Sequence, residues 1–409
     1  MKRYLKWMIS IILCLIFIRD GVTFWRGMRT PDILTANVEL EYEMKGVWIA
    51  TVLNLDYPTV PTDSAEELRR QADLILNNVE EWGFNAVFLQ VRPCSDAFYD
   101  SEIFPWSVYL TGKQGRAPED GFDPLQYWVQ EAHERNLEVH AWINPFRIAQ
   151  KEAAWNALTA DSPAKQHPEW VVKYKDDYYF DPAIPEVRKL LVDGTMELVM
   201  NYEVDGIHMD DYFYPGIDFY DDVSYAVYGG GFTDIGDWRR NNVNLLIHDM
   251  SIAIHTFNPH LKFGISPHAV WAEKLQYEDG SDTTGSFSSY DDLYADTKYW
   301  VEAGWLDYIA PQIYYTIGDE RNDFMILLNW WTDVVEESET DTKLYIGLAD
   351  YKASEEGYFS PWYNGKEIAR QMNACRSSSK IDGMLHFRYK FIVDNPALRH
   401  IICQAYQTE

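Results

Sequence analysis

Several common functional signatures are scarce or missing in this chain of 409 residues. Only four cysteines are present, and none has the CxxC spacing of a zinc ribbon or a redox pair, so neither site is indicated and no disulfide framework is expected. Basic residues are few, with 35 Lys and Arg against 64 Asp and Glu, and the formal net charge is −29. Nucleic-acid binding needs clustered Lys and Arg, so we expect no nucleic-acid partner.

Motifs for bound cofactors and metals are also missing. The stretch TVLNLDYPTVP (51–61), which follows the first expected strand, is not a Gly-rich phosphate loop. Neither an HxH nor an HExxH pair occurs. We therefore expect no cofactor and no resident metal. A metal held by His208 and Asp210, with His140 or His268 added, is kept as an alternative.

Aromatic side chains, in contrast, are plentiful, with 16 Trp and 28 Tyr. These residues favour places with one apolar face and one wet edge. A sugar-binding cleft is such a place, so the composition is compatible with a glycan ligand.

The N-terminus has the pattern of an export signal. A basic start, MKRYLKW, precedes the apolar run MISIILCLIFI (8–18), which is short for a membrane-spanning helix. We expect a signal peptide or signal anchor over 1–20, a linker over 21–44 and one domain over 45–409. The domain is expected outside the cytoplasm, either secreted or tethered to the membrane by this segment.

Eight strand-like runs alternate with amphipathic segments in the rest of the chain. The segment SAEELRRQADLILNNVEEWG (64–83) places four apolar residues on one helical face, namely Leu68, Ala72, Ile75 and Val79. Eight such units predict an α/β fold, a closed (β/α)8 TIM barrel. The expected strands are 46–52, 86–92, 138–145, 204–211, 262–267, 306–315, 343–351 and 381–389. The other expected helices are 124–136, 185–203, 237–257, 290–304, 322–338 and 365–379, and the segment NPALRHIICQAYQ (395–407) closes the chain in the eighth unit.

The segments that follow the strands are longer than those that follow the helices. Four of them, 93–123, 145–184, 212–236 and 268–289, are rich in Trp, Tyr, Asp and Gly. In a TIM barrel the loops after the strands build the functional face, so the site is expected at the C-terminal ends of the strands.

Alternation along the strands predicts which side chains enter the barrel. The apolar set of each strand is expected to face the helices, and the other set becomes polar toward the C-terminal end. The inward set includes Arg92, Trp142, Asn144, His208, Asp210, Gln312 and Tyr314, with His386 and Arg388 in the last strand. Convergence of polar residues from different strands predicts a pocket.

The stretch VDGIHMDDYFYP (204–215) contains the main catalytic candidate. Asp210 should point inward near the mouth, where Arg92 would keep it ionised as a nucleophile or cation stabiliser. Asp211 is expected to point to the other face or into the loop. Glycoside hydrolysis needs a second carboxylate, and Asp211 and Glu273 are candidates for it.

Six segments together resemble glycosyl-hydrolase-like family 10, and the resemblance spans about residues 44–400. They are GVWIATVLNLDYPT, LQVRPCSDAFYDSEIFPWSVYLTGKQG, DPLQYWVQEAHERNLEVHAWINPFR, VDGIHMDDYFYP, ISPHAVW and DYIAPQIYYT. The resemblance implies a (β/α)8 barrel, a cell-envelope location and glycoside hydrolysis. It also implies peptidoglycan glycan strands lacking stem peptides as the substrate.

The segment DGIHMD also resembles the fourth-strand motif of the α-amylase clan, whose final Asp is the nucleophile of a retaining reaction. That role would fall on Asp210. The sequence departs from this clan at GISPH, where no Glu ends the strand, and APQIYY lacks the acid that related barrels carry. The acid/base and the stereochemical outcome therefore stay open.

These observations predict an exported glycoside hydrolase with an aromatic cleft across the barrel mouth. Candidate catalytic residues are Asp210, Asp211 and Glu273. Candidate substrate-binding residues are Arg92, Trp142, Asn144, His208, Tyr212, His268, Trp271, Gln312 and Tyr314, among which Trp142, Tyr212 and Trp271 are the expected stacking platforms. The alternatives are a non-catalytic glycan-binding barrel and a metal-dependent polysaccharide hydrolase.

Overall fold

A computed structural model describes residues 43–355 and 357–407. The predicted signal segment (1–20) and nearly all of the predicted linker (21–44) lie outside the described residues. Residues from Glu43 onward form one compact unit. In the part of the chain that the structure describes, no helix is both long and apolar enough to span a bilayer.

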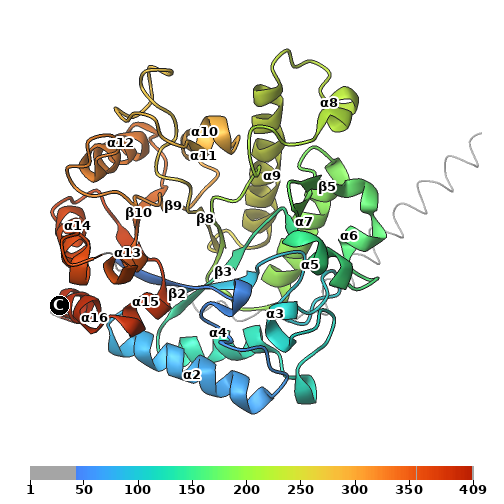
Figure 1. Cartoon of the computed structure of the whole chain (residues 1–409), viewed down its shortest axis with the longest axis horizontal. Helices are drawn as coiled ribbons and strands as arrows, with labels where there is room; N and C mark the ends of the chain where they lie inside the picture. The colour runs from blue at the N-terminus through green and yellow to red at the C-terminus, as the bar shows by residue number, and fades with distance from the viewer. Residues whose placement is uncertain (1–42, 356, 408–409) are drawn as a thin grey trace, which may run out of the picture. The chain divides into compact units, whose positions relative to one another are not determined.

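Eight parallel strands close into a barrel with helices around it (Figure 1). The strands are β1 (Met44–Ile49), β2 (Ala86–Arg92), β3 (Glu138–Ile143), β7 (Gly206–Met209), β8 (Lys262–Ile265), β9 (Tyr308–Ile309), β10 (Lys343–Leu348) and β11 (Gly383–His386). Each barrel strand pairs with its neighbour in parallel, and β11 closes the ring on β1. The prediction of a (β/α)8 TIM barrel is confirmed.

The helices that cover the barrel follow the predicted amphipathic segments. They are α2 (Ala65–Glu81), α4 (Pro124–Glu134), α7 (Pro185–Asn201), α9 (Ile235–Phe257), α12 (Phe324–Glu337), α14 (Lys366–Arg376) and α16 (Pro396–Tyr406). Side-chain caps set several starts: Ser64 accepts the Glu67 N–H before α2, and Asp123 accepts the Gln126 N–H before α4. The four residues predicted on the inner face of α2 are all buried.

Several elements are shorter than their patterns suggested, and two of them show a local reason. The helix predicted over 290–304 divides into α10 (Ser289–Asp292) and α11 (Thr297–Glu302), because Tyr294 between them has a left-handed φ of 52°. The strand predicted over 306–315 keeps regular pairing only at β9, since Pro311 has no N–H to donate. Gln312 still forms single parallel bridges to its two neighbours, His268 after β8 and Gly347 of β10.

Buried apolar residues form an inner and an outer layer around the strands. The inner layer fills the barrel and includes Trp48, Phe88, Trp142, Tyr308 and Leu385. The outer layer packs between strands and helices. His386 was predicted to face inward, but it contacts Tyr406 of α16 and Asp350 instead. The inward residue of β11 is its neighbour Leu385.

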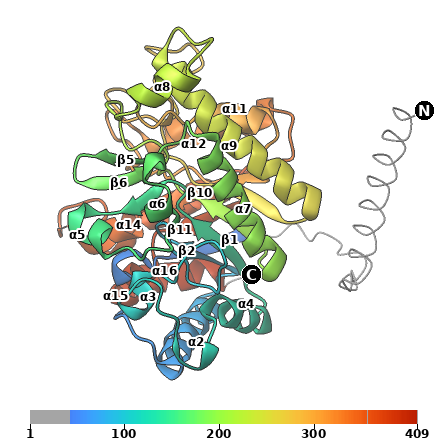
Figure 2. The same ribbon diagram turned by 90° about the vertical axis from the view of Figure 1, so that its right-hand side faces the viewer.

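An additional small sheet interrupts the long segment between β3 and α7. The antiparallel strands β4 (Arg147–Ala149), β6 (Asp177–Phe180) and β5 (Val171–Tyr174) pair in that order. Figure 2 shows β5 and β6 beside α5 (Lys151–Ala157) and α6 (Pro163–Gln166), to one side of the barrel. The sequence analysis treated this segment as a loop.

Candidate active site

Asp210 lies at the C-terminal end of β7, one residue beyond the last paired position. Its side chain is only 4% exposed. Nδ2 of Asn144 is 2.7 Å from both carboxylate oxygens, and the backbone N–H of Tyr212 donates to Oδ1 at 3.3 Å. These groups are all donors, so they fit the ionised form of the carboxylate.

A chain of amides holds Asn144 in this orientation. The backbone N–H groups of Thr51 and Val52 donate to Oε1 of Gln90 at 3.0 and 2.9 Å. Nε2 of Gln90 then donates to Oδ1 of Asn144 at 2.7 Å. Because Oδ1 is occupied by this bond, the amide nitrogen of Asn144 is the group that faces Asp210.

Asp211 also belongs to the mouth of the barrel, which differs from the expectation that it points away. It is half-buried, and Nε2 of Gln312 donates to its Oδ1 at 3.2 Å and to the carbonyl of Ser266 at 2.8 Å. Strict alternation stops at Met209, the last residue of β7, so two consecutive residues can turn toward the same opening.

Burial and mutual repulsion make the two carboxylates weak acids. Burial, followed by the nearby charge of Asp211, raises the pKa of Asp210 to about 7. Arg147 and the Asn144 bond oppose this rise. Burial also raises the pKa of Asp211, against the charge of His268 and the bond from Gln312. Neighbouring carboxylates of this kind titrate as a pair, and near neutral pH the pair holds one proton.

Arg92, the cation expected beside Asp210, lies in the outer layer, so that prediction is wrong. The pairing of β2 with β3 shifts register between Gln90 and Arg92, and this irregularity turns the side chain outward. Its guanidinium lies 4.3 Å from the ring centre of Phe104 and closely approaches Gly194 of α7.

The cation at the site is Arg147, which the sequence analysis missed. Arg147 begins β4 and its charge acts on both Asp210 and Asp211. Its guanidinium lies 4.3 Å from the ring centre of Tyr212. Arg147 lies three residues after Asn144, beyond the end of β3, where strand alternation no longer predicts the direction of a side chain.

The three predicted stacking platforms differ in their access to solvent. Tyr212 is 55% exposed and can receive a sugar. Trp142 is 5% exposed and belongs to the core inside the barrel. Trp271 is 7% exposed, stacks on Trp330 at 5.9 Å, and donates its N–H to Asp296. The prediction of an exposed platform is therefore wrong for Trp142 and Trp271.

An exposed aromatic residue that the sequence analysis did not select lies near Asp211. Phe287 is 48% exposed, and its ring is 5.4 Å from the ring of His268. The charges of His268 and Asp211 act on each other. Burial lowers the pKa of His268, and its buried Nδ1 has no hydrogen-bond partner in the described chain. His268 is therefore a buried polar group that interacts with Asp211.

Tyr314 and Gln312 lie where the sequence placed them. The charge of Asp211 contributes, after burial, to raising the pKa of Tyr314 well above its ordinary value. The Tyr314 hydroxyl is buried and has no hydrogen-bond partner within residues 43–355 and 357–407. A buried hydroxyl without a partner is costly unless a ligand or water completes it, so this group fits a substrate contact.

Glu273 is engaged within its own loop. It is 8% exposed and accepts the backbone N–H of Ser286 at 2.6 Å. This bond stabilises the loop, and the role of Glu273 as a second catalytic carboxylate stays a prediction.

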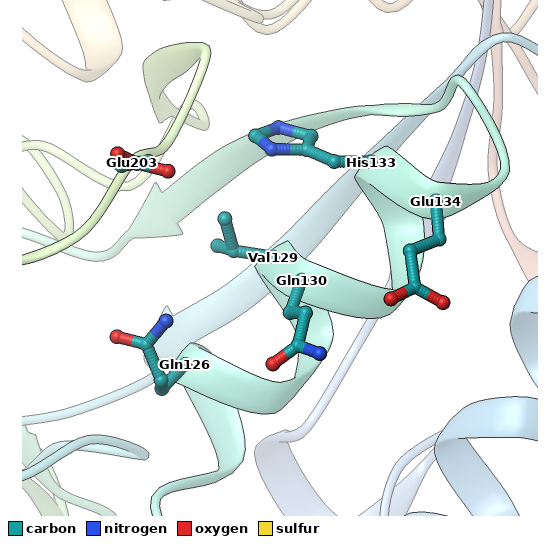
Figure 3. Close-up of a pocket in the computed structure, with 6 residues that line it drawn as sticks. All are labelled: Gln126, Val129, Gln130, His133, Glu134 and Glu203. Carbon is teal, nitrogen blue, oxygen red and sulfur yellow. The ribbon is translucent and has the colours of Figure 1, made fainter.

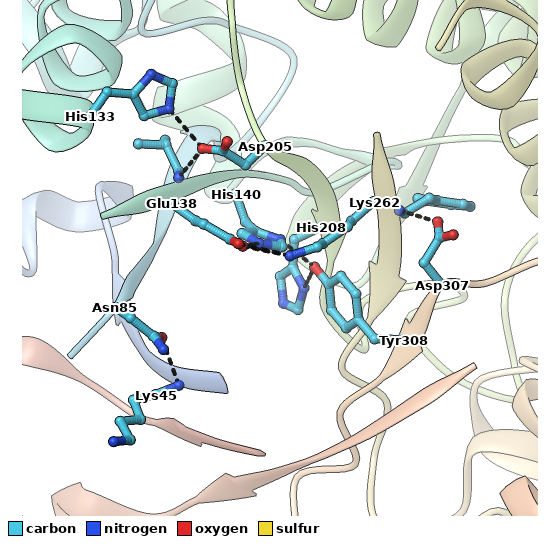
Figure 4. Close-up of polar contacts among 12 residues, drawn as sticks. Lys45, Asn85, His133, Glu138, His140, Asp205, His208, Lys262, Asp307 and Tyr308 are labelled. Carbon is cyan, nitrogen blue, oxygen red and sulfur yellow. Dashed lines mark hydrogen bonds and ion pairs between the residues drawn. The ribbon is translucent and has the colours of Figure 1, made fainter. Parts of the chain in front are cut away.

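His208 is a core residue, not a substrate ligand. It is fully buried, and Nε1–H of Trp48 donates to its Nε2 at 3.1 Å. The ring proton therefore lies on Nδ1, 3.1 Å from the hydroxyl of Tyr308. That hydroxyl in turn donates to Nδ1 of His140 at 2.9 Å, and Nε2 of His140 contacts Glu138 (Figure 4). Burial holds the pKa of His208 well below its usual value.

The arrangement of these histidines gives no support to a metal held by His208 and Asp210, because both ring nitrogens of His208 are engaged. Within the described ranges, no group of three or more His, Cys, Asp and Glu side chains could hold a metal ion. The donor sets near Asp210 are carboxylates, amides and an arginine.

A surface hollow lies far from this chemistry. It is lined by Gln126, Val129, Gln130, His133 and Glu134 of α4 and by Glu203 (Figure 3). His133 bonds to Asp205 just before β7, so the hollow is at the N-terminal ends of the strands. Active sites of TIM barrels lie at the opposite end, and Asp210 does too.

The fold and the site together define a glycoside hydrolase-like TIM barrel, with acidic residues at the C-terminal end of the fourth barrel strand. The family model described as Glycosyl hydrolase-like 10 matches residues 43–364. The chain belongs to this family.

Curated relatives and solved structures agree with this assignment. The chain is 43% identical over 366 residues to Glycosyl hydrolase YngK of Bacillus subtilis, covering 88% of this chain and 71% of the relative. It is 40% identical over 371 residues to Glycosyl hydrolase DigH of Escherichia coli K12, covering 85% and 83%. The glycoside hydrolase domain of PgaB (BpsB) from Bordetella bronchiseptica shares the fold, with a TM-score of 0.56 at 14% identity over 88% of this chain and 99% of that domain.

Proposed function

We propose that this protein is an exported glycoside hydrolase that cleaves peptidoglycan glycan strands lacking stem peptides. The observation that carries the proposal is the carboxylate pair Asp210 and Asp211 at the barrel mouth, flanked by the exposed ring of Tyr212. Family membership supports hydrolysis of a glycosidic bond. The apolar N-terminal run supports export.

The two carboxylates fit different roles in this reaction. Asp210 accepts from Asn144 and from a backbone N–H, so it is the member of the pair suited to carry negative charge as nucleophile or oxocarbenium stabiliser. Asp211 accepts one bond on Oδ1, which leaves Oδ2 able to hold the shared proton. Asp211 would then serve as the general acid toward the leaving oxygen.

The surrounding polar groups would orient the sugar at the reactive position. Gln312 and the partnerless hydroxyl of Tyr314 lie near Asp211. Tyr212 beside Arg147 and Phe287 beside His268 offer exposed rings on which sugar rings can stack.

Product analysis tests the proposal. The purified full chain is incubated with peptidoglycan strands with and without stem peptides, and released fragments are identified by mass spectrometry. Asp210→Asn and Asp211→Asn should release no fragments from the peptide-free strands. Asp341→Asn is the matched control, because Asp341 is exposed in the turn before β10.

The alternatives give different outcomes. Retained glycan binding by the wild type and both site variants, with no fragments from any of them, would identify a non-catalytic glycan-binding barrel. Fragments from Asp210→Asn at the wild-type rate would contradict the assigned role of Asp210. The reducing ends of the fragments name the bond that is cut.

A further inference from the structure

Arg147 differs from the buried arginines that this chain uses for structure. Arg239 pairs with Asp221 at 2.5 Å and Arg388 with Asp56 at 2.6 Å, and all four side chains are buried. Arg147 is 8% exposed, hydrogen-bonds to Tyr212 and has no carboxylate within 4.0 Å among the described residues. A buried guanidinium normally has an ionic partner, so the missing carboxylate points to a ligand.

The position of Arg147 also suits a ligand. Its guanidinium lies against the ring of Tyr212, which is the exposed platform of the site, and its charge acts on the carboxylate pair. Nε and Nη1 of Arg92 are sealed from solvent without a partner, whereas no Arg147 nitrogen is sealed in this way. The fork of donors on an arginine matches a carboxylate in two parallel bonds.

The charge of the site makes such a cation necessary for an acidic substrate. The whole chain carries a formal charge of −29, and Asp210 and Asp211 add local negative charge at the mouth. A glycan that carries carboxylates would be repelled by this field unless a cation compensates.

Building on the proposed function, we propose that Arg147 binds a free carboxylate on the sugar that stacks on Tyr212. In peptidoglycan this group is the lactyl carboxylate of N-acetylmuramic acid. A stem peptide converts that carboxylate into an amide, which removes the charge and adds bulk. Arg147 thereby makes the enzyme selective for strands without stem peptides, and it acts as a specificity residue, not a catalytic one.

The test compares two substrates that differ in one charge. Peptide-free strands are used unmodified or with their lactyl carboxylates converted to methyl amides, and kcat and KM are measured for wild type, Arg147→Gln and Arg147→Lys. Arg147→Gln should raise KM for the unmodified strand by about tenfold to a hundredfold, the range of one or two charge-assisted bonds. The preference for the unmodified strand should disappear with it.

Two further variants exclude trivial explanations. Arg147→Lys keeps the charge but loses the fork, so it should restore part of the preference. Arg70→Gln is the matched control, since Arg70 is an exposed residue of α2 that pairs with Glu67, and it should keep the full preference. Thermal unfolding of each variant establishes that the protein is folded.

The proposal is overturned if Arg147→Gln lowers kcat by the same factor on both substrates, because the arginine would then act only through Asp210. An unchanged preference would also overturn it. If the wild type cuts neither substrate, the proposed function fails, and fluorescence anisotropy with labelled strands decides the inference alone. Weaker binding of only the unmodified strand by Arg147→Gln supports the inference, and equal binding contradicts it.

A third substrate separates two sources of the carboxylate. An oligosaccharide that alternates N-acetylglucosamine with glucuronic acid carries its carboxylate on the sugar ring. Cleavage of this glycan instead of peptidoglycan strands, with a KM that depends on Arg147, would keep the carboxylate site and overturn the proposed substrate.

Discussion

Gln90 donates one hydrogen bond to Asn144 at 2.7 Å, and this bond determines which end of the Asn144 amide meets Asp210. Gln90 lies on β2 and Asn144 directly follows the neighbouring strand β3, and neither is exposed. The catalytic candidate is therefore oriented by a second layer of amides, which is itself anchored on backbone N–H groups after β1.

Removal of the Asn144 amide should change the acidity of the site. Asn144→Leu deletes the donor to both oxygens of Asp210, a bond that lowers its pKa, so the pKa rises further above about 7. The limb of the pH–rate profile that reports ionisation of the pair should move to higher pH by about one unit. The profile is obtained from kcat/KM at a series of pH values. Asn201→Leu, on an exposed position of α7, should leave it in place, and an identical profile for Asn144→Leu would contradict the assignment.

Asp210 should lower the free energy of unfolding at neutral pH. Its pKa is raised from 3.8 to about 7 in the folded chain, so between these values the Asp210–Asp211 pair of the folded chain holds a proton that the unfolded chain has released. The free energy of unfolding therefore falls as the pH rises through this window. Asp210→Asn removes the penalty and should stabilise the protein at pH 8 by about 1–4 kcal/mol, with little change near pH 3.5. Urea titrations at both pH values measure this, with Asp341→Asn as the control. A less stable Asp210→Asn protein at pH 8 would be inconsistent with a raised pKa.

Tyr212 and Trp271 should respond in opposite ways to truncation. Tyr212→Ala removes an exposed ring and should weaken glycan binding by about 1–2 kcal/mol, with little loss of stability. Trp271→Ala opens a cavity beside Trp330 and should lower the free energy of unfolding by about 3–5 kcal/mol. Calorimetric titration with peptide-free strands and urea denaturation separate the two effects. Equal loss of glycan affinity in both folded variants would place Trp271 in the cleft after all.

Chelation should leave the activity intact. Both nitrogens of His208 already bond to protein groups, so a metal cannot bind between His208 and Asp210 without breaking the contacts to Trp48 and Tyr308. Protein dialysed against EDTA should hydrolyse glycan strands at the rate of the untreated protein, and elemental analysis should find no stoichiometric metal. Loss of activity that Zn²⁺ restores would revive the metal-dependent alternative.

Sequence patterns predicted the barrel and part of the site because alternation holds along regular strands. Phe88, Gln90, His140, Asn144 and Asp210 all point inward as their strands require. Amphipathic helices such as α2 were predicted equally well, since burial of one helical face makes apolar residues recur in the sequence with a period of 3.6 residues.

The errors occur where regular structure ends. Arg92 follows a register shift in β2, and a single irregular residue reverses the direction of every later side chain. Trp271 lies in a long loop, where side-chain direction depends on distant contacts such as the one with Trp330. Arg147 lies on β4, which pairs with the distant strand β6 by placing Arg147 opposite Tyr179. A local sequence pattern does not reveal such a pairing.

The small sheet that carries Arg147 is a separate structural module from the barrel that carries Asp210 and Asp211. In the proposed function, bond cleavage and recognition of the sugar carboxylate therefore depend on different segments of the chain, one built from barrel strands and the other inserted between β3 and α7. With such a division, substrate specificity can change through substitutions in residues 145–184 while the barrel residues that cleave the bond stay the same. The length and sequence of this insertion are accordingly the first place to search when members of the family differ in the glycans they degrade.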